Sequence, residues 1–260
     1  MPTLTSPRNP LIKEVRKAVL RGATTEDGLA VAESFHLLEE ALRSDCEIAG
    51  VFAAESVRSA VESHVRGLKS IRVTVLPDDL FRTISSTEAS QGVIALVRPP
   101  HWTLDQLFRG ECLTVILDGL QDPGNAGAIL RAAEAFGATG VAFLKGTVNP
   151  YNPKCLRGSA GSVFRVPVAA AMDPRLVLAA AEQRKVDLFA LMPKGAHDVG
   201  ESNFTRRCAL IVGSEGHGVS EHMGTRATPI RSPTLGVESL NAAQATSIVL
   251  YIAQRQRMST

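Results

Sequence analysis

The sequence predicts an α/β protein with two domains, and three observations lead to this prediction. Apolar runs of strand length alternate with helix-like stretches along most of the chain. In the second part, several runs are continuously apolar, which is typical of a parallel sheet buried on both faces. Between the parts, Pro99 and Pro100 are adjacent, and neither a helix nor a central strand accommodates such a pair. The expected regions are a small α/β sandwich domain at 1–98, a linker at 99–112 and a parallel-sheet domain at 113–260.

The first part is expected to alternate helices with short strands. Leu37, Leu38 and Ala41 recur at helical spacing, which predicts a helix with one apolar face. Short apolar runs bounded by polar residues predict the strands. The expected helices are 11–20, 29–42, 57–65 and 78–84, and the expected strands are 48–53, 71–76 and 92–97.

The second part is expected to alternate in the same way, around a larger sheet. Gly137 follows a helix-like stretch and is expected to end it, as glycine often does at a helix C-terminus. The expected strands are 113–117, 140–144, 163–168, 187–191, 209–212 and 228–230, and the expected helices are 126–136, 174–183 and 242–256.

Composition excludes several classes of protein. The 260 residues are 45% hydrophobic, which is enough for a core, and the net charge of +2 is too small to indicate nucleic-acid binding by itself. No two of the 4 cysteines are close in sequence, so neither a zinc site nor a redox motif is expected. The N-terminus lacks the apolar core of a signal peptide, and no run is apolar enough to span a bilayer. We expect a soluble, cytoplasmic protein that needs neither membrane nor metal.

The first helix carries a concentration of basic residues. Lys13, Arg16, Lys17 and Arg21 fall within one short N-terminal stretch, and Lys13, Arg21 and either of the other two are spaced to share one helical face. Such a face could follow an RNA phosphate backbone. Taken alone, an ordinary solvated helix face explains it better.

A first polar segment joins a strand to a helix at 117–131. Loops that follow the carboxyl ends of parallel strands are where α/β proteins bind ligands. If Asn125 lies in the loop ahead of the helix, it can approach Arg131; alternatively, Asn125 simply caps the helix. Arg131 sits among apolar residues, and a charge in that position should be paired or should face a site.

Two further polar segments follow later strands. The sequence at 210–219 crowds three glycines around Glu215 at the end of a buried strand, and glycine lets the backbone approach a ligand closely. The third segment holds Glu238, Ser239 and Asn241 before an alanine-rich helix, and Asn241 with Gln244 resembles a capping box. A glycine-rich turn with an exposed acid and an ordinary capped helix are the simpler explanations.

Together these segments resemble the signature motifs of the SpoU (TrmH-like) family of RNA 2′-O-methyltransferases. They read NAGAILRAAEAFG, GSEGHGVS and ESLNAAQA, in family order, and a fourth similar stretch runs from Pro150 through Arg157. The resemblance covers residues 113–256. The first part is similar to the small RNA-binding domain that precedes many such enzymes, although Glu33-Ser34 stands where relatives often have Glu-Gly.

The resemblance implies a fold and a cofactor. It implies a trefoil-knotted catalytic domain, a feature that pattern reasoning alone would not propose because knots are rare. It also implies a homodimer with the knots at the interface and S-adenosylmethionine bound in a bent form. By motif matching, the cofactor would contact Gly213, Ile230 and Leu240 largely through their backbone, with Glu215 organising the site.

The resemblance also points to Arg131 as the key catalytic residue. Because a guanidinium stays protonated in proteins, we expect Arg131 to hold an RNA phosphate and stabilise the developing alkoxide, while Ser239 or a phosphate oxygen carries the proton. Asn125 and Asn241 are expected to orient the ribose and the loops. The residues expected to bind RNA are Lys13, Arg16, Lys17, Arg131 and Arg157.

Two other functions fit the sequence less well. A dinucleotide- or nucleotide-binding enzyme is disfavoured because the first segment reads Gly124-x-x-Gly127, which is neither G-x-G-x-x-G nor a phosphate-binding loop. A non-catalytic RNA-binding protein on the same fold is disfavoured because the candidate catalytic residues are all retained. The two-domain form and the basic first helix favour ribosomal RNA over transfer RNA as the substrate.

Overall fold

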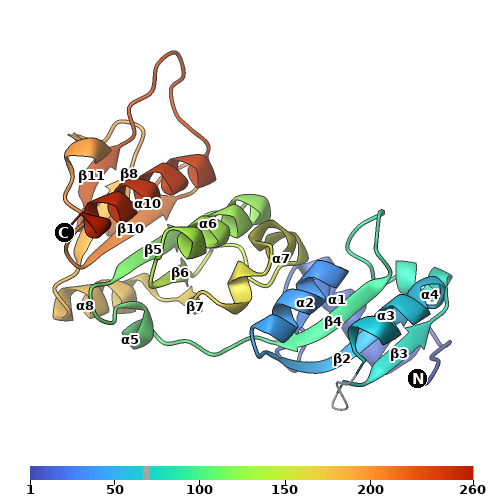
Figure 1. Cartoon of the computed structure of the whole chain (residues 1–260). Coiled ribbons are helices and arrows are strands. Elements are labelled where there is room, and N and C mark those ends of the chain that lie inside the picture. Colours follow the sequence, from blue (N-terminus) through green and yellow to red (C-terminus); the bar gives the residue numbers. More distant parts are fainter. Residues whose placement is uncertain (67–70, 260) are drawn as a thin grey trace. The chain divides into compact units, whose positions relative to one another are not determined.

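The computed structural model describes residues 1–66 and 71–259 and divides into two compact units (Figure 1). The first unit comprises Met1–Pro100 together with Tyr151–Phe164. The second comprises His101–Pro150 and the chain from Arg165 onward. The backbone therefore passes between the units three times, and residues 151–164, inside the range expected to be catalytic, pack with the N-terminal unit.

The first unit is a four-stranded mixed sheet covered by helices. Its strand order is β1-β4-β2-β3; β4 is antiparallel to β1 and β2, and β2 is parallel to β3. The core includes the apolar face of the first helix, with Ile12 and Val15 fully buried. The elements are α1 (Pro10–Arg21), β1 (Ala30–Glu33), α2 (Phe35–Arg43), β2 (Glu47–Ala54), η1 (Glu55–Val57), α3 (Arg58–His64), β3 (Val73–Leu76), α4 (Asp78–Arg82), β4 (Val93–Arg98), α7 (Pro153–Ser159) and η2 (Ser162–Phe164).

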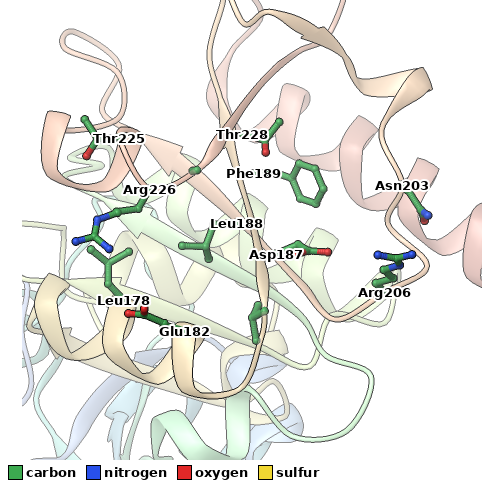
Figure 2. Close-up of a pocket in the computed structure, with 12 residues that line it drawn as sticks. Leu178, Glu182, Asp187, Leu188, Phe189, Asn203, Arg206, Thr225, Arg226 and Thr228 are labelled. Atoms are coloured by element: carbon green, nitrogen blue, oxygen red, sulfur yellow. The ribbon is translucent and has the colours of Figure 1, made fainter.

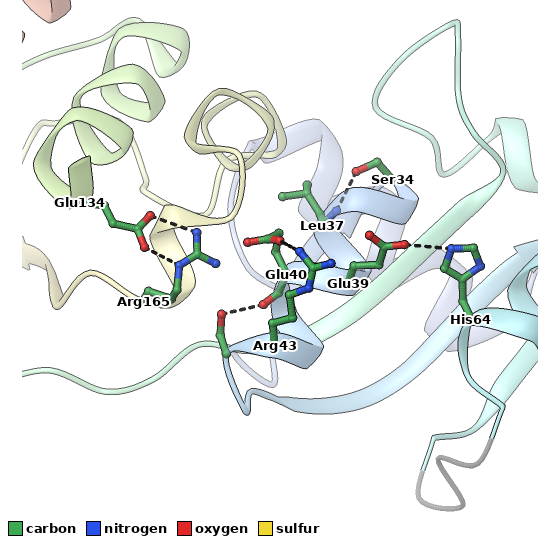
Figure 3. Close-up of polar contacts among 9 residues, drawn as sticks. Ser34, Leu37, Glu39, Glu40, Arg43, His64, Glu134 and Arg165 are labelled. Atoms are coloured by element: carbon green, nitrogen blue, oxygen red, sulfur yellow. Dashed lines mark hydrogen bonds and ion pairs between the residues drawn. The ribbon is translucent and has the colours of Figure 1, made fainter.

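The helix expected at 29–42 is wrong in its first turn, because residues 30–33 form β1. All four residues of this strand are buried and pair with β4, so sheet pairing decides their conformation. The helix begins after Ser34, whose hydroxyl accepts a 3.1 Å hydrogen bond from the backbone N–H of Leu37 (Figure 3). Ser34 adopts φ 153°, a conformation that glycine favours.

Residues 151–164 contain a short helix, α7, that the sequence did not suggest. The strand expected at 163–168 is also wrong: 162–164 form a 3-10 turn, and the strand β7 begins only at Val168. Val163 and Phe164 are buried, so their apolar character reports burial rather than strand conformation. Gly161 permits this packing, because it has φ +88° and a Cβ there would lie 2.5 Å from the Cβ of Glu40.

The second unit is built on a seven-stranded sheet in which all pairs are parallel, as expected from its apolar runs. The strand order is β7-β6-β5-β10-β8-β11-β9. The chain moves outward from β5 to β7 and then returns to the other side of β5, which creates a switch point beside β10. The strands are β5 (Leu113–Asp118), β6 (Gly140–Leu144), β7 (Val168–Met172), β8 (Asp187–Leu191), β9 (His197–Asp198), β10 (Cys208–Gly213) and β11 (Thr228–Arg231).

Helices cover this sheet, and the last helix is hydrogen-bonded to the segments that lead into its central strands, β5 and β10. Arg257 donates hydrogen bonds to the carbonyl oxygens of Phe204, Glu111, Cys112 and Arg206 at 2.6–2.9 Å. Of the described helices, none has the length and apolar character needed to cross a membrane. The remaining elements are α5 (Leu104–Leu107), α6 (Pro123–Ala135), α8 (Pro174–Gln183), η3 (Val199–Glu201), α9 (Glu221–Gly224) and α10 (Ala242–Met258), with α6 packed against α10 (Figure 1).

Candidate functional site

A cleft with a volume of about 960 Å³ lies at the carboxyl ends of β8 and β10. It is formed by four stretches of the chain: the end of β8 with the residues after it, the end of β10 with the turn that follows, Ser232 after β11, and the segment that leads into α10. The lining residues are Leu191, Met192, Pro193, Lys194, Val212, Gly213, Ser214, Glu215, Gly216, His217, Gly218, Val219, Ser232, Glu238, Ser239, Leu240, Asn241, Ala242 and Ala245.

Close packing between the end of β10 and the turn that follows explains why residue 213 is a glycine. The turn folds back on itself, and Ser214 and Gly218 exchange backbone hydrogen bonds of 3.0 and 2.9 Å. A Cβ on Gly213 would lie 2.0 Å from the carbonyl carbon of Gly218, so only glycine fits. Asp118, at the end of β5, accepts a 2.7 Å hydrogen bond from the backbone N–H of Ser220 and fixes the end of the turn.

Two hydrogen bonds join the three motif segments at the edge of this cleft. The side-chain amide of Asn241 donates to the Oδ1 of Asn125 at 2.9 Å, and the amide of Asn125 donates to Glu215 at 2.9 Å. The bonded residues are 116 and 90 positions apart in sequence. The sequence nominated these three residues separately, and the fold brings them into one chain of hydrogen bonds.

Asn125 occupies a different local position from either of those expected. It lies inside α6, which begins at Pro123, and the helix cap is Asp122, whose carboxylate accepts from the backbone N–H of Asn125 at 2.8 Å. Asn125 is therefore neither in the preceding loop nor the cap, and its side chain is available for Glu215 and Asn241. Asn241 does cap α10, accepting hydrogen bonds from the backbone N–H groups of Ala243 and Gln244.

Glu215 is held as a carboxylate by these donors. Its partial burial favours a higher pKa, but hydrogen bonds from Asn125 and from nearby backbone N–H groups outweigh burial, so its pKa lies below the ordinary glutamate value. The backbone N–H of Gln121 contributes one of these contacts, at 3.5 Å. A fixed negative charge thus sits at the edge of the cleft, beside the start of α6.

Arg131 projects from α6 as an exposed side chain between the buried residues Leu130 and Ala132. Within residues 1–66 and 71–259, its guanidinium makes no hydrogen bond or ion pair. Nearby on the same helix, Glu134 pairs with Arg165 at 2.5 and 3.0 Å, so that arginine is already engaged (Figure 3). A charge in this position was expected to be paired or to face a site. Among the described residues, Arg131 is not paired.

The other cofactor candidates divide between the lining of the cleft and the layer behind it. Gly213 and Leu240 line the cleft, as does Ser239, which was expected to be catalytic. Ile230 is fully buried behind it, and its carbonyl accepts a 2.9 Å hydrogen bond from Met192, which is a lining residue. Sequence reasoning passed over Ser232, which follows β11 and also lines the cleft, because no motif marks it.

The residues of the first unit that are expected to bind RNA differ in whether their side chains already have partners within the unit. Arg16 donates to the carbonyl and hydroxyl oxygens of Thr83, and Lys17 is ion-paired with Glu26. Arg157 donates to the hydroxyl of Ser86 at 2.5 Å. Lys13 is exposed and makes no side-chain bond among the described residues. The basic face of α1 is therefore partly committed to contacts within the unit.

A second hollow, of about 780 Å³, lies at the opposite ends of the strands, where β8 and β11 begin (Figure 2). Leu188 and Phe189 form part of its apolar lining, and Arg206 and Arg226 contribute charged side chains. It shares no lining residue with the cleft. Of the motif residues, Glu215, Ser239 and Asn241 line the cleft, whereas Asn125 and Arg131 line neither hollow.

The described part of the chain contains no group of three or more histidine, cysteine or acidic side chains able to hold a metal ion. Burial raises the pKa of Cys155 to about 12 and that of Cys208 to about 11, so these thiols stay protonated.

Comparisons with known proteins agree with this geometry. A crystal structure of the SpoU methyltransferase AviRb from Streptomyces viridochromogenes in complex with the cofactor AdoMet superposes with a TM-score of 0.86 at 27% identity, covering 97% of this chain and 99% of that one. An AdoMet-bound rRNA methyltransferase from Sinorhizobium meliloti gives a TM-score of 0.83 at 27% identity, covering 97% of each chain. These similarities extend over both units.

Sequence relatives give the same assignment. The 23S rRNA (guanosine(2553)-2′-O)-methyltransferase RlmP of Bacillus subtilis is 30% identical over 96% of this chain and 98% of its own. The 23S rRNA (uridine(2479)-2′-O)-methyltransferase of Streptomyces viridochromogenes is 33% identical over 75% of this chain and 71% of its own. Residues 9–95 match the MRM3-like substrate binding domain, and residues 112–251 match the SpoU rRNA Methylase family. The chain is thus a member of the SpoU rRNA methylase family.

Proposed function

We propose that this protein transfers a methyl group from S-adenosylmethionine to a ribose 2′-hydroxyl of ribosomal RNA, with 23S rRNA as the substrate. The observation that carries the proposal is the hydrogen-bonded chain Asn241–Asn125–Glu215, which gathers the three motif segments at the edge of a cleft. The relatives named above as 23S rRNA 2′-O-methyltransferases support the choice of RNA.

The cleft suits the cofactor in size and in chemistry. Small-molecule sites occupy roughly 300–1,000 Å³ and combine apolar walls with a few polar groups. The backbone of Gly213 and Leu240 would hold the cofactor, and the buried hydroxyl of Ser232 is a polar group without a protein partner among the described residues. When bound, S-adenosylmethionine supplies a methyl group that is electrophilic because its sulfur is positively charged.

The residues of the chain would then manage the RNA. Arg131 holds a phosphate next to the reacting ribose and stabilises negative charge as the 2′-oxygen loses its proton. An RNA phosphate oxygen takes that proton, either directly or through the hydroxyl of Ser239, which lines the cleft and gives up its own proton as it receives one. The bonded pair Asn125 and Asn241 keeps α6 and the start of α10 in register, so that Arg131 is presented at a fixed place.

We extend the proposal to a homodimer with the trefoil knot at its interface, acting in the cytoplasm where ribosomal RNA is made. An exposed apolar face on α10 supports the dimer: Ile248 is 40% and Tyr251 50% exposed, and Tyr251 stacks edge-on against Phe136 with ring centroids 5.9 Å apart. A second copy covering this face would bury these side chains. In the first unit, Lys13 and the neighbouring basic residues would contact the RNA backbone.

The test is incubation of purified protein with labelled S-adenosylmethionine and unmodified RNA, separated into 23S, 16S and transfer RNA. Label in 23S rRNA that protects one nucleotide linkage from alkaline cleavage is the expected result, because a methylated 2′-oxygen cannot attack its phosphate. Label in transfer RNA would support the methyl-transfer reaction but would refute 23S rRNA as its substrate. Absence of both label and cofactor binding would favour the alternative function, a non-catalytic RNA-binding protein.

A further inference from the structure

Ser232 stands apart from the other serines that line the cleft. It lies in the segment that follows β11, one residue after the strand ends at Arg231. Its hydroxyl oxygen is buried and has no hydrogen-bond partner in the described chain. Ser214, another lining serine, differs in that its hydroxyl accepts a hydrogen bond from the backbone N–H of His217 at 3.1 Å.

A buried hydroxyl without a partner destabilises a folded protein. Leaving such a group unpaired is unfavourable because its hydrogen bonds to water are lost, and buried polar side chains are almost always hydrogen-bonded. Because Ser232 borders a cleft, rotation about its χ1 angle turns the hydroxyl toward whatever fills that cleft. We infer that Ser232 is a cofactor-binding residue, whose hydroxyl hydrogen-bonds a neutral polar atom on the nucleoside half of S-adenosylmethionine.

The assignment to the nucleoside half follows from charge. Adenosine carries neutral donors and acceptors, whereas the amino-acid half carries an ammonium and a carboxylate. A neutral hydroxyl closed off from solvent suits neutral atoms, because moving a charge into such a place is costly. The charged lining side chains, Lys194, Glu215 and Glu238, are all exposed, and they suit the charged half. This inference rests on the proposed function, because it requires that the cleft binds this cofactor.

The experiment compares wild type with Ser232→Ala by isothermal titration calorimetry and thermal unfolding. The probes are S-adenosylhomocysteine and 5′-methylthioadenosine, which lacks the amino-acid half. Ser232→Ala is expected to raise the Kd of both by the same factor, about 3- to 10-fold, the loss of one neutral hydrogen bond. Without ligand, its Tm is expected to equal or exceed that of wild type, because an unpaired hydroxyl has been removed.

Ser202→Ala is the matched control, because the hydroxyl of Ser202 donates to the carbonyl of Asp198 at 3.0 Å outside the cleft. It is expected to lower the Tm and leave both Kd values unchanged, the opposite pattern. Ser232→Thr retains a hydroxyl and is expected to bind more tightly than Ser232→Ala. An unchanged Kd in Ser232→Ala, or an effect on S-adenosylhomocysteine alone, would overturn the inference. Wild type that binds neither probe would instead refute the proposed function.

Discussion

Glu33 in the first unit and Glu215 in the second are two carboxylates that gather donors from distant parts of the chain. Glu33 is 3% exposed and accepts hydrogen bonds from the hydroxyls of Ser85, Ser86 and Ser90 and from the backbone N–H of Ser86. Glu215 is exposed and accepts from Asn125 and the backbone of Gln121 at the edge of a cleft. The first arrangement is closed to solvent, and the second is open to a ligand.

Arg157 in the first unit and Arg131 in the second differ in a similar way. Arg157 donates to Ser86, which itself donates to Glu33, so the arginine completes an internal network. Arg131 lies on the same helix as Asn125 and makes no bond within the described chain. A network that satisfies its members stabilises the fold, whereas an exposed guanidinium without a partner among the described residues is available for one from outside the chain.

The largest effect is expected from Arg131→Ala. Loss of a group that stabilises developing negative charge typically lowers kcat by about 100- to 1,000-fold. Because the side chain is exposed and unpaired, Tm and the Kd for S-adenosylmethionine should stay at wild-type values. Methyl transfer to 23S rRNA under saturating cofactor measures kcat. Arg175→Ala, an exposed arginine on α8, is the control with unchanged activity, and transfer at the wild-type rate in Arg131→Ala would refute the role.

Glu33→Ala is expected to give the largest loss of stability. Removing the carboxylate leaves several buried donors unpaired, which should lower the free energy of unfolding by about 3 kcal/mol in urea titrations of the full chain. Glu47→Ala is the comparison, because Glu47 forms an exposed ion pair with Arg98 that is worth about 1 kcal/mol or less. Glu215→Ala should resemble Glu47→Ala in stability yet lose activity. Equal losses of unfolding free energy in Glu33→Ala and Glu47→Ala would show that the hydrogen bonds to Glu33 do not stabilise the loop that donates them.

Asn241 allows the two roles of one side chain to be separated. Asn241→Ala removes both the cap of α10 and the bond to Asn125, so the stability should fall by about 1 kcal/mol and kcat by about 10-fold. Asn241→Asp keeps the oxygen that caps the helix but loses the amide that donates to Asn125. It should therefore keep its Tm and lose activity. If Asn241→Asp is fully active, Asn241 serves only as a helix cap.

The smallest effect is expected in the titration of Glu215. Hydrogen bonds to the carboxylate keep its folded-state pKa below the ordinary value. The stability that these bonds contribute is therefore present above the ordinary glutamate pKa and is lost as the pH falls through the lowered, folded-state pKa. Asn125→Ala should raise the pKa of Glu215, as measured by carbon-13 NMR of the side-chain carboxyl. Asn203→Ala, outside the cleft, should leave it unchanged.

Most of the fold could be predicted from the sequence, and the two segments that were assigned the wrong secondary structure share one cause. The continuous apolar runs gave the parallel sheet correctly, because strands buried on both faces need them. Apolar runs were misleading at residues 30–33 and at Val163 and Phe164, where hydrophobicity reports burial but not backbone conformation. Helix α7 escaped prediction because its seven residues are too few to display a helical period.

The candidate site could be predicted residue by residue, but not as an arrangement. The motifs nominated Asn125, Glu215 and Asn241, yet no pattern states that three side chains so far apart in sequence share hydrogen bonds. Ser232 had no motif, since its signal is a missing partner, which only a structure displays. The basic face of α1 is the opposite case. The sequence shows its charges, but only the structure shows that Lys17 is already ion-paired with Glu26.

The three passages of the backbone between the units constrain how the protein is made on the ribosome. The substrate-binding unit includes residues 151–164, so it cannot finish folding when residue 100 has emerged. At roughly 5–20 residues per second, this delay lasts on the order of several seconds, during which the surface that later receives α7 stays uncovered. Translation speed across residues 101–164 thus sets the exposure of that surface to chaperones and proteases.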